Sequence, residues 1–340
     1  MTGMKGGKTA AVLGAGSWGT ALAIHLARVG HDVRLWARDP ALVDDMHARR
    51  ANAVYLPDAT LPDTLRVTAS MEEALHGARL VVAAVPSHGT RSVLRRAVRF
   101  VEPDATIVSA TKGLESESLQ RPSEVIAEEL DAGRPIVVLS GPSFAAEVAR
   151  QLPTAICAAS EDIEAAERVQ EEFRSRYFRL YASTDVAGVE MGGAMKNVIA
   201  IAAGAVEGLG LGQNALAGLI TRGLAEITRL ACAVGAQRET LAGLSGLGDL
   251  VLTCTGSLSR NRHVGVELAR GRRLDEVLAG MKMIAEGVRT TDAALALGAR
   301  CGVELPITEQ IADVLAGRKD VPAAVEDLML RRQRAEAETG

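Results

Sequence analysis

The 340-residue sequence has no excess of positive charge, no clustered cysteines and no long apolar run. The formal net charge of -4 argues against nonspecific nucleic-acid binding, which requires a basic surface. The four cysteines (Cys157, Cys232, Cys254 and Cys301) are far apart and form no C-x-x-C pair. This spacing favours reduced thiols with packing roles over a metal site or a disulfide framework.

Apolar runs such as residues 198–206 are too short to span a bilayer. Residues 1–8 include lysines but no apolar segment of the signal-peptide kind, so we expect a loose extension there. We therefore expect a cytoplasmic protein with no membrane span and no metal. The composition, 48% hydrophobic and 24% charged, is typical of a globular chain, and the length allows two domains.

A glycine-rich motif lies near the start of the chain. The apolar run 9–13 predicts a strand, G-x-G-x-x-G follows with Gly14, Gly16 and Gly19, and residues 20–28 have helical periodicity. Gly14 permits a tight turn, Gly16 lets the backbone approach a pyrophosphate, and Gly19 lets the helix pack closely on the strand. In this strand–turn–helix context the motif favours dinucleotide binding over a plain glycine turn, with phosphate bound at the helix N-terminus.

Strand and helix signals then alternate as far as residue 185, and helical segments follow. The expected strands are 32–37, 65–68, 80–85, 105–110, 135–139, 155–158 and 178–181. This order predicts an α/β fold: a doubly wound Rossmann-like sheet in residues 1–185 and an all-helical second domain in residues 186–340. The loops at 86–88, 111–113 and 140–145 are expected along one edge of the sheet, where ligands bind in such folds.

The end of the second expected strand bears on the choice of cofactor. An acidic residue at this point binds ribose hydroxyls in NAD sites, whereas an arginine accepts a 2′-phosphate. Arg38 lies at the end of the strand and Asp39 follows it. We expect NADPH to be preferred and NADH to be possible because Asp39 is near; a solvated Arg-Asp turn is the alternative.

Two further residues at strand ends could carry chemistry. Lys112 directly follows an apolar strand, where an ammonium could reach a phosphate or a substrate oxygen. A solvated surface lysine is the alternative. His88 could carry a proton, but a histidine in a polar loop is more often merely exposed, so we assign it no role.

Lys196 is the strongest catalytic candidate in the helical half. It lies in an expected helix over residues 186–206 that carries almost no other charge, and Gly192, Gly193 and Ala200 share its face. Burial lowers the pKa of an ammonium, and a general acid–base works best with a pKa near the operating pH. The alternative is a lysine that extends to the surface.

An anion site is expected further along the helical half. Asp249 follows a glycine turn, and Ser259 is a natural N-cap that leaves Arg260 and Asn261 in a first helical turn. A cation at a helix N-terminus suggests a bound anion, most simply a substrate phosphate. A solvated arginine is the alternative. The amphipathic helix at 216–234 is a core element or, alternatively, a subunit contact.

Together these motifs resemble the bacterial-type glycerol-3-phosphate dehydrogenase family over residues 12 to about 315. The motifs are G-A-G-S-W-G-T-A-L-A, A-V-P-S-H, A-T-K-G-L-E, S-G-P-S-F-A-x-E, G-A-M-K-N-V-I-A-I, G-L-G-D-L-V-L-T-C-T and S-R-N-R. The resemblance implies hydride transfer between NAD(P)H and dihydroxyacetone phosphate, a phosphorylated triose. The product, sn-glycerol 3-phosphate, would supply phospholipid synthesis. A homodimer is also the family expectation.

The resemblance also implies site residues, position by position. Beside the three glycines, the implied cofactor contacts are Ser17, Trp18, Arg38, Lys112, Ala145, Arg260, Ile284 and Glu286. The implied substrate contacts are Lys112, Gly141, Ser143, Lys196, Asp249, Ser259, Arg260 and Asn261, with Lys196 as proton donor and acceptor. Met195 where leucine is usual, and Ser143 where threonine is also common, are small departures that remove no functional group.

Three other interpretations are weighed against this one. A non-catalytic NAD(P)-sensing regulator would bind the cofactor without turnover and would leave Lys196 and Asp249 without a purpose. A reductase for a hydroxyacid or ketopantoate-like substrate would hold a carboxylate at the anion site. A methyltransferase is disfavoured by Arg38 and by the helical second half.

Overall fold

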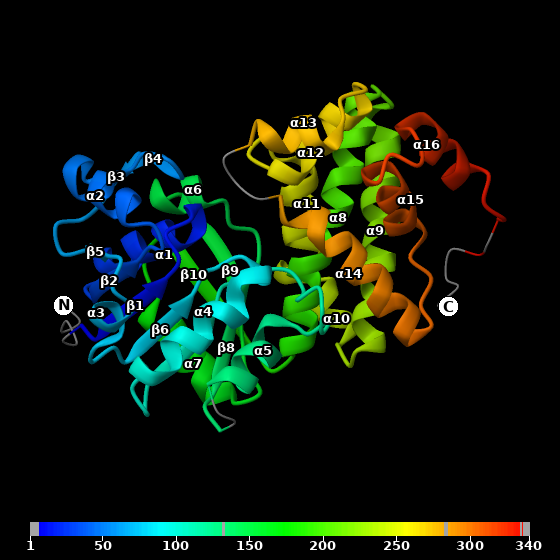
Figure 1. Cartoon of the computed structure of the whole chain (residues 1–340). Helices are drawn as coiled ribbons and strands as arrows, with labels where there is room; N and C mark the ends of the chain where they lie inside the picture. The colour runs from blue at the N-terminus through cyan, green and yellow to red at the C-terminus, as the bar shows by residue number, and fades with distance from the viewer. Residues whose placement is uncertain (1–6, 131–132, 282–284, 334, 336–340) are drawn as a thin grey trace. The chain divides into compact units, whose positions relative to one another are not determined.

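Eight strands pair into one sheet in the first part of the chain (Figure 1). The computed structural model describes residues 7–130, 133–281, 285–333 and 335. The strands of this sheet are β1 Thr9–Leu13, β2 Asp32–Trp36, β5 Arg66–Thr68, β6 Leu80–Ala83, β7 Thr106–Ser109, β8 Ile136–Ser140, β9 Thr154–Ala159 and β10 Phe178–Ser183. Each strand expected from the sequence is present, with ends within about two residues.

The order across the sheet is β10-β9-β8-β7-β6-β1-β2-β5. Neighbouring strands are parallel except β8 and β9, which are antiparallel. Because β6, β7 and β8 are parallel neighbours, the loops that follow them leave the same edge of the sheet. The sequence prediction of three polar loops along one edge is confirmed.

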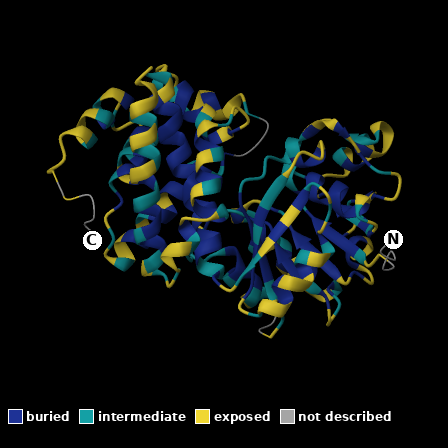
Figure 2. Ribbon diagram, turned by 180° about the vertical axis from the view of Figure 1, so that it is seen from behind, coloured by how far each residue is buried: buried dark blue, intermediate teal, exposed yellow. Residues whose placement is uncertain are grey.

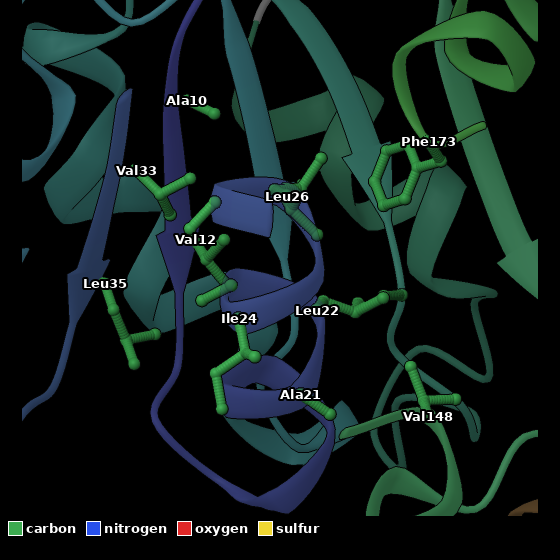
Figure 3. Packing of buried hydrophobic residues seen from close by; sticks show 14 of the residues in the cluster. Ala10, Val12, Ala21, Leu22, Ile24, Leu26, Val33, Leu35, Val148 and Phe173 are labelled. Atoms are coloured by element: carbon green, nitrogen blue, oxygen red, sulfur yellow. The ribbon is translucent and has the colours of Figure 1, made fainter. Parts of the chain in front are cut away.

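Helices connect the strands and cover the sheet. They are α1 Ser17–Arg28, α2 Pro40–Arg49, α3 Met71–Leu75, α4 Thr90–Ala97, α5 Pro122–Glu129, α6 Ala145–Ala149 and α7 Ile163–Glu172. The short pieces η1 Ser87–Gly89 and η2 Val98–Phe100 and a hairpin of β3 Ala51–Asn52 with β4 Leu56–Thr60 complete this part. The apolar face of α1 packs on β1 and β2, where Val12, Leu22 and Val33 are fully buried (Figure 3).

The second part of the chain is helical. Its elements are α8 Val186–Gly208, α9 Gly212–Ala233, α10 Arg238–Leu241, the π-turn η3 Leu244–Gly248, α11 Asp249–Thr255, α12 Arg260–Ala269, α13 Leu274–Ala279, α14 Glu286–Cys301, α15 Pro306–Leu315 and α16 Val321–Met329. The central helix is α8, in which every residue from Gly188 to Val206 is buried (Figure 2). A helix that is apolar all round can be stable in water only when other elements surround it.

By length and composition, α8 is one helix of the described part that could cross a membrane, and a bent pair (Arg238–Thr255 with Arg260–Ala269) would make a second. In α8, 89% of the apolar window is buried inside the protein. The core helix of a globular protein passes the same test, and here the other helices cover this one.

Two compact units emerge from the contacts within the chain. The first comprises Met1–Thr111 and Pro122–Val186, and the second comprises Lys112–Arg121 and Ala187–Gly340. The boundary near residue 186 lies where the composition changes. The segment Lys112–Arg121, here called the crossing segment, groups with the helices, whereas the expected first domain, residues 1–185, included it.

Glycines let α8 and α12 approach each other closely. A Cβ built on Gly204 of α8 would overlap the carbonyl of Arg262, and one built on Gly265 of α12 would overlap the carbonyl of Ile201. The backbones of the two helices are therefore in direct contact. This close approach holds the start of α12 against the carboxy-terminal third of α8.

Candidate active site

The glycine loop between β1 and α1 has the geometry of a dinucleotide-binding turn. Gly14 has φ +113°, a conformation that favours glycine, and a Cβ there would lie 2.5 Å from the Ala84 oxygen. A Cβ on Gly19 would overlap the carbonyl of Gly14. At Gly16, by contrast, a Cβ would meet no described atom within 4 Å. The first and third glycines are thus required by packing, while the second borders open space that a ligand could occupy.

The first turn of α1 supports the same interpretation. Gly16 is the N-cap and has no side chain that could bind the N–H groups of the turn. The Trp18 indole Nε1 is buried and has no hydrogen-bond partner among the described residues, which is costly for a donor. The Ser17 hydroxyl donates to the carbonyl of Tyr55 at 2.7 Å. These observations fit a nicotinamide dinucleotide with its pyrophosphate on this helix end.

At the end of β2, Arg38 and Asp39 have different environments. Arg38 is exposed directly beyond the strand. Asp39 is the N-cap of α2, and its carboxylate accepts a hydrogen bond from the Ala41 N–H at 3.0 Å. The carboxylate of Asp39 thus caps the helix, whereas Arg38 is exposed.

The loop after β8 carries the remaining expected site residues of the first unit. Gly141 has φ +147°, and a Cβ there would lie 2.8 Å from the Ile156 Cα. The Ser143 hydroxyl donates to the Gly141 carbonyl at 3.0 Å, which folds the loop back on itself. Ala145, half-buried, begins α6. No larger residue than glycine fits position 141, so the loop follows the sheet closely.

In the second unit, two of the expected lysines bind the carboxylate of a third expected residue, Asp249. Asp249, fully buried, begins α11 after the π-turn. Its Oδ2 accepts a hydrogen bond from the Lys112 Nζ at 2.7 Å, and its Oδ1 accepts one from the Lys196 Nζ. Lys196 is only 7% exposed, and the Lys112 side chain is 18% exposed. The sequence prediction that Lys196 is a buried lysine on α8 is confirmed.

The surroundings of Lys196 lower its pKa to about 7 from a usual value of 10.5. Burial is the largest cause, because it removes water from the ammonium. Asp249 opposes the shift, and the positive charge of Lys112 adds to it. An amine with this pKa gains and loses a proton readily near neutral pH, as a general acid–base must.

The start of α12 forms a polar group beside the helix that carries Lys196. Ser259 is the N-cap, as predicted, and its hydroxyl accepts the Arg262 N–H at 3.2 Å. The buried Asn261 donates its amide to the Asn197 side-chain oxygen at 2.9 Å and accepts the Gly287 N–H at 3.0 Å. Asn261 therefore ties three helices, α8, α12 and α14, to one another.

Arg260 and Glu286 complete this group. Arg260 is exposed in the first turn of α12, and the carboxylate of Glu286, at the start of α14, acts electrostatically on it. Ile284 lies outside the described residues. Asn197 was not singled out in the sequence, although an amide directly after a buried lysine on an apolar helix was the available signal.

Within the described part of the chain, no group of three or more His, Cys, Asp or Glu side chains could hold a metal ion. The Cys254 thiol, buried near Lys196, has its pKa raised to about 12 by burial and is therefore inert as a nucleophile. The charged groups around Asp249 are the two ammonium groups that bind its carboxylate.

Comparison with known families gives an assignment for both halves of the chain. Residues 9–166 match the family model for the N-terminus of NAD-dependent glycerol-3-phosphate dehydrogenase, and residues 185–326 match the model for its C-terminus. The chain belongs to the NAD-dependent glycerol-3-phosphate dehydrogenase family. It is an NAD(P)-dependent oxidoreductase, as its motifs predicted.

Curated relatives in this family are similar over most of the chain. The glycerol-3-phosphate dehydrogenase [NAD(P)+] of Koribacter versatilis is 54% identical over 270 residues, which cover 78% of this chain and 80% of that protein. The protein of the same name from Thioalkalivibrio sulfidiphilus is 55% identical over 265 residues, with the same coverage.

Solved structures show the same fold. The glycerol-3-phosphate dehydrogenase of Coxiella burnetii is 42% identical with a TM-score of 0.92, covering 96% of this chain and 99% of that one. A ketopantoate reductase of Ralstonia eutropha JMP134 matches with 16% identity and a TM-score of 0.59, over 95% of this chain and 99% of that one. This weaker likeness concerns the fold alone, so the comparisons favour the dehydrogenase family over the ketopantoate-like alternative.

Proposed function

We propose that this dehydrogenase interconverts dihydroxyacetone phosphate and sn-glycerol 3-phosphate, with Lys196 as proton donor and acceptor. The observation that carries the proposal is the buried ammonium of Lys196 on Asp249, with a pKa of about 7. Ketone reduction places negative charge on the C2 oxygen, and an ammonium with this pKa can protonate that oxygen without a large energetic penalty. In the oxidation direction the neutral amine accepts the proton of the alcohol.

Asp249 and Lys112 prepare Lys196 for this role. The carboxylate of Asp249 orients the amine, and Lys112 neutralises part of the carboxylate charge. Without Lys112, Asp249 would hold the Lys196 proton more tightly. The ammonium of Lys112 is also our candidate for binding a substrate oxygen, because it faces the same carboxylate as Lys196.

The start of α12 is our candidate for the phosphate site. Arg260 supplies a guanidinium, which suits the bidentate binding of phosphate. Ser259 retains a hydroxyl proton as a possible donor, since its oxygen acts as the acceptor for the helix. Asn261 keeps α8 and α12 in register through Asn197. Phosphate binding would hold the three-carbon body in place for proton transfer.

For the cofactor we propose Gly14, Gly16, Ser17, Trp18 and Gly19 at the pyrophosphate. The other proposed cofactor contacts are Lys112, Ala145, Arg260, Ile284 and Glu286. The proposed substrate contacts also include Gly141 and Ser143. When bound, the nicotinamide supplies the hydride that C2 of the ketone accepts. We propose NADPH as the preferred form, because Arg38 is exposed at the rim while Asp39 caps α2.

The remaining proposals concern the cellular context. We propose that the enzyme acts in the cytoplasm as a homodimer and supplies glycerol 3-phosphate for phospholipid synthesis. The alternative of a non-catalytic NAD(P) sensor is disfavoured, because sensing alone would not require a buried lysine with a pKa near neutrality.

The deciding experiment follows NADPH absorbance after addition of dihydroxyacetone phosphate to the purified protein. We expect rapid oxidation of NADPH with this ketone and little with dihydroxyacetone, which lacks the phosphate. Binding of NADPH without turnover of the phosphorylated ketone would instead support the sensor. Equal turnover of a 2-ketoacid would support the hydroxyacid alternative.

A further inference from the structure

A second buried ion pair joins Arg121 to Glu190 of α8, the helix that also carries Lys196. The Arg121 Nη1 donates to the Glu190 Oε2 at 3.0 Å, and the Glu190 side chain is only 1% exposed. Glu190 precedes Lys196 by six residues, about 9 Å along a helix. A carboxylate on so apolar a helix is costly to bury, and replacing such a pair by apolar residues is often neutral or stabilising. Stability alone therefore does not account for the pair.

Its position in the chain suggests a role. Arg121 is the last residue of the crossing segment and Lys112 is the first. One end of the segment binds Asp249 through Lys112, and the other binds α8 through Arg121. Between them, Leu114 is 2% exposed and packs in the core that surrounds α8. Leu119 packs against the same core, so an ion pair at each end and two apolar residues between them hold the segment to the helical unit.

The turn before Arg121 needs such an anchor. Leu119 has φ +62°, a left-handed conformation that is unfavourable for residues with a Cβ. The turn is closed by the Leu119 N–H on the Glu115 carbonyl at 2.9 Å and the Glu115 N–H on the Gln120 carbonyl at 3.0 Å. Such a conformation persists only where its surroundings hold it. Arg121, two residues further on, supplies a fixed point.

We propose that Arg121 and Glu190 are a positioning pair, which holds the crossing segment on α8 so that Lys112 stays bound to Asp249. The inference rests on the proposed function, because it concerns the ammonium that faces Asp249 together with Lys196. Neither Arg121 nor Glu190 takes part in the chemistry; both act through Lys112.

The consequence for Lys196 has a definite sign. The charged groups that act on the pKa of Lys196 are Asp249 and Lys112, and Lys196 in turn acts on the buried Cys254 thiol. If Lys112 leaves Asp249, the carboxylate acts on Lys196 alone and the pKa of Lys196 rises. Ketone reduction needs the ammonium, so the pH at which its rate falls moves upward.

The test compares Arg121→Met, Glu190→Gln and the double variant, which removes both charges of this ion pair together, so that neither is left buried without the other. Hydrogen exchange of residues 112–121 and the pH profile of kcat are measured together. We expect hydrogen exchange in the segment to accelerate about tenfold or more and kcat to fall about tenfold. The pH at which kcat for ketone reduction declines should rise by at least about half a pH unit. Arg121→Lys should recover most of kcat.

The matched control is Glu117→Gln, which removes one charge from the exposed part of the same segment. It should leave exchange and the pH profile at wild-type values. Wild-type exchange in the folded double variant, or an unmoved pH limb, would overturn the positioning role. If the wild-type enzyme itself fails to reduce dihydroxyacetone phosphate, the proposed function is wrong, and the exchange data still decide whether the pair anchors the segment.

Discussion

Lys112 and Lys196 bind the two oxygens of one carboxylate, that of Asp249, from different parts of the chain. The residues are 84 positions apart, from 112 to 196 in the sequence. Two ammonium groups on a single buried carboxylate leave an excess of positive charge where water is scarce. A proton is therefore easily released from the more deeply buried ammonium, and this property underlies the first two predictions.

The first prediction concerns Lys196→Met, which keeps the length of the side chain and removes the amine. We expect kcat to fall by about two to four orders of magnitude, the usual scale of general acid–base catalysis. Circular dichroism and NADPH binding should be unchanged. The control is Lys319→Met. Lys319 pairs with Asp327, away from Asp249, and its replacement should leave kcat at the wild-type value. Near wild-type kcat in Lys196→Met would exclude the lysine as the proton donor.

The second prediction concerns pH. Because the pKa of Lys196 is about 7, ketone reduction should slow as the pH rises through about 7, and alcohol oxidation should accelerate over the same range. In Asp249→Asn the carboxylate that raises this pKa is gone. The fall of the reduction rate and the rise of the oxidation rate should therefore both occur at lower pH. Rate profiles in both directions measure the shift, with the exposed Asp275→Asn as the control. Limbs that stay in place would mean that another group titrates.

The third prediction concerns cofactor choice at the end of β2. Arg38→Asp replaces a cation that can bind the 2′-phosphate by an anion that repels it. The ratio of kcat/KM for NADPH to that for NADH should fall about tenfold to a hundredfold, the scale of a charge-assisted hydrogen bond. Arg174→Asp, at an exposed arginine of the same unit, controls for the change in net charge. An unaltered ratio in Arg38→Asp would remove this residue from cofactor selection.

The fourth prediction concerns the stability of the first unit. His25 is buried, with its ring nitrogens 2.7 Å from the Phe173 carbonyl and 3.0 Å from the Tyr177 hydroxyl. Burial lowers its pKa from 6.5 to about 4. Between these pH values His25 is protonated in the unfolded chain but neutral in the folded protein. The stability from this group is present above pH 6.5 and decreases by roughly 1.4 kcal/mol per pH unit as the pH falls toward 4.

Urea unfolding of wild type and His25→Gln measures this dependence. The two tryptophans, Trp18 and Trp36, both lie in the first unit, so their fluorescence reports the unit that contains His25. The advantage of wild type over His25→Gln should shrink between about pH 7 and about pH 4.5. An advantage that stays constant over this range would contradict the shifted pKa.

The fifth prediction concerns the contact between α8 and α12. In Gly204→Ala the new methyl group would overlap the Arg262 carbonyl, so the helices must separate. We expect a loss of about 1–3 kcal/mol in the free energy of unfolding, as for other overpacked positions. Gly218→Ala on the exposed face of α9, where a Cβ meets no described atom within 4 Å, should instead stabilise by about 0.5–1 kcal/mol. Equal melting temperatures for the two variants would argue against the close contact.

The strands and the central helix were predictable because their signals are local. A continuous apolar run such as 80–83 specifies a strand buried on both faces, and an apolar helix such as α8 specifies burial all round. The direction of pairing is not local, and the antiparallel contact of β8 with β9 could not be read from either run. The hairpin of β3 and β4 is too short to give a periodic signal.

In the candidate site, too, local features were predictable and long-range contacts were not. The backbone turn at Gly14, the packing of Gly19 on Gly14 and the cap at Ser259 are local, and these roles were predictable from the sequence. The bond of Asn261 to Asn197 and that of Arg121 to Glu190 join distant segments. A single sequence contains no record of such pairings. Glu190 was not singled out in the sequence, although a carboxylate in an apolar helix is seldom left unpaired.

The route of the chain constrains how this enzyme can be recombined with its relatives. The covalent chain passes between the units at residues 111–112, 121–122 and 186–187, so one cut after residue 186 does not separate them. A chimera that joins the amino-terminal half of one homologue to the carboxy-terminal half of another takes Lys112 from one parent and Asp249 from the other. Gene shuffling with a single breakpoint there would mix two versions of one charge cluster, whereas exchanging residues 112–121 together with the helices would keep it intact.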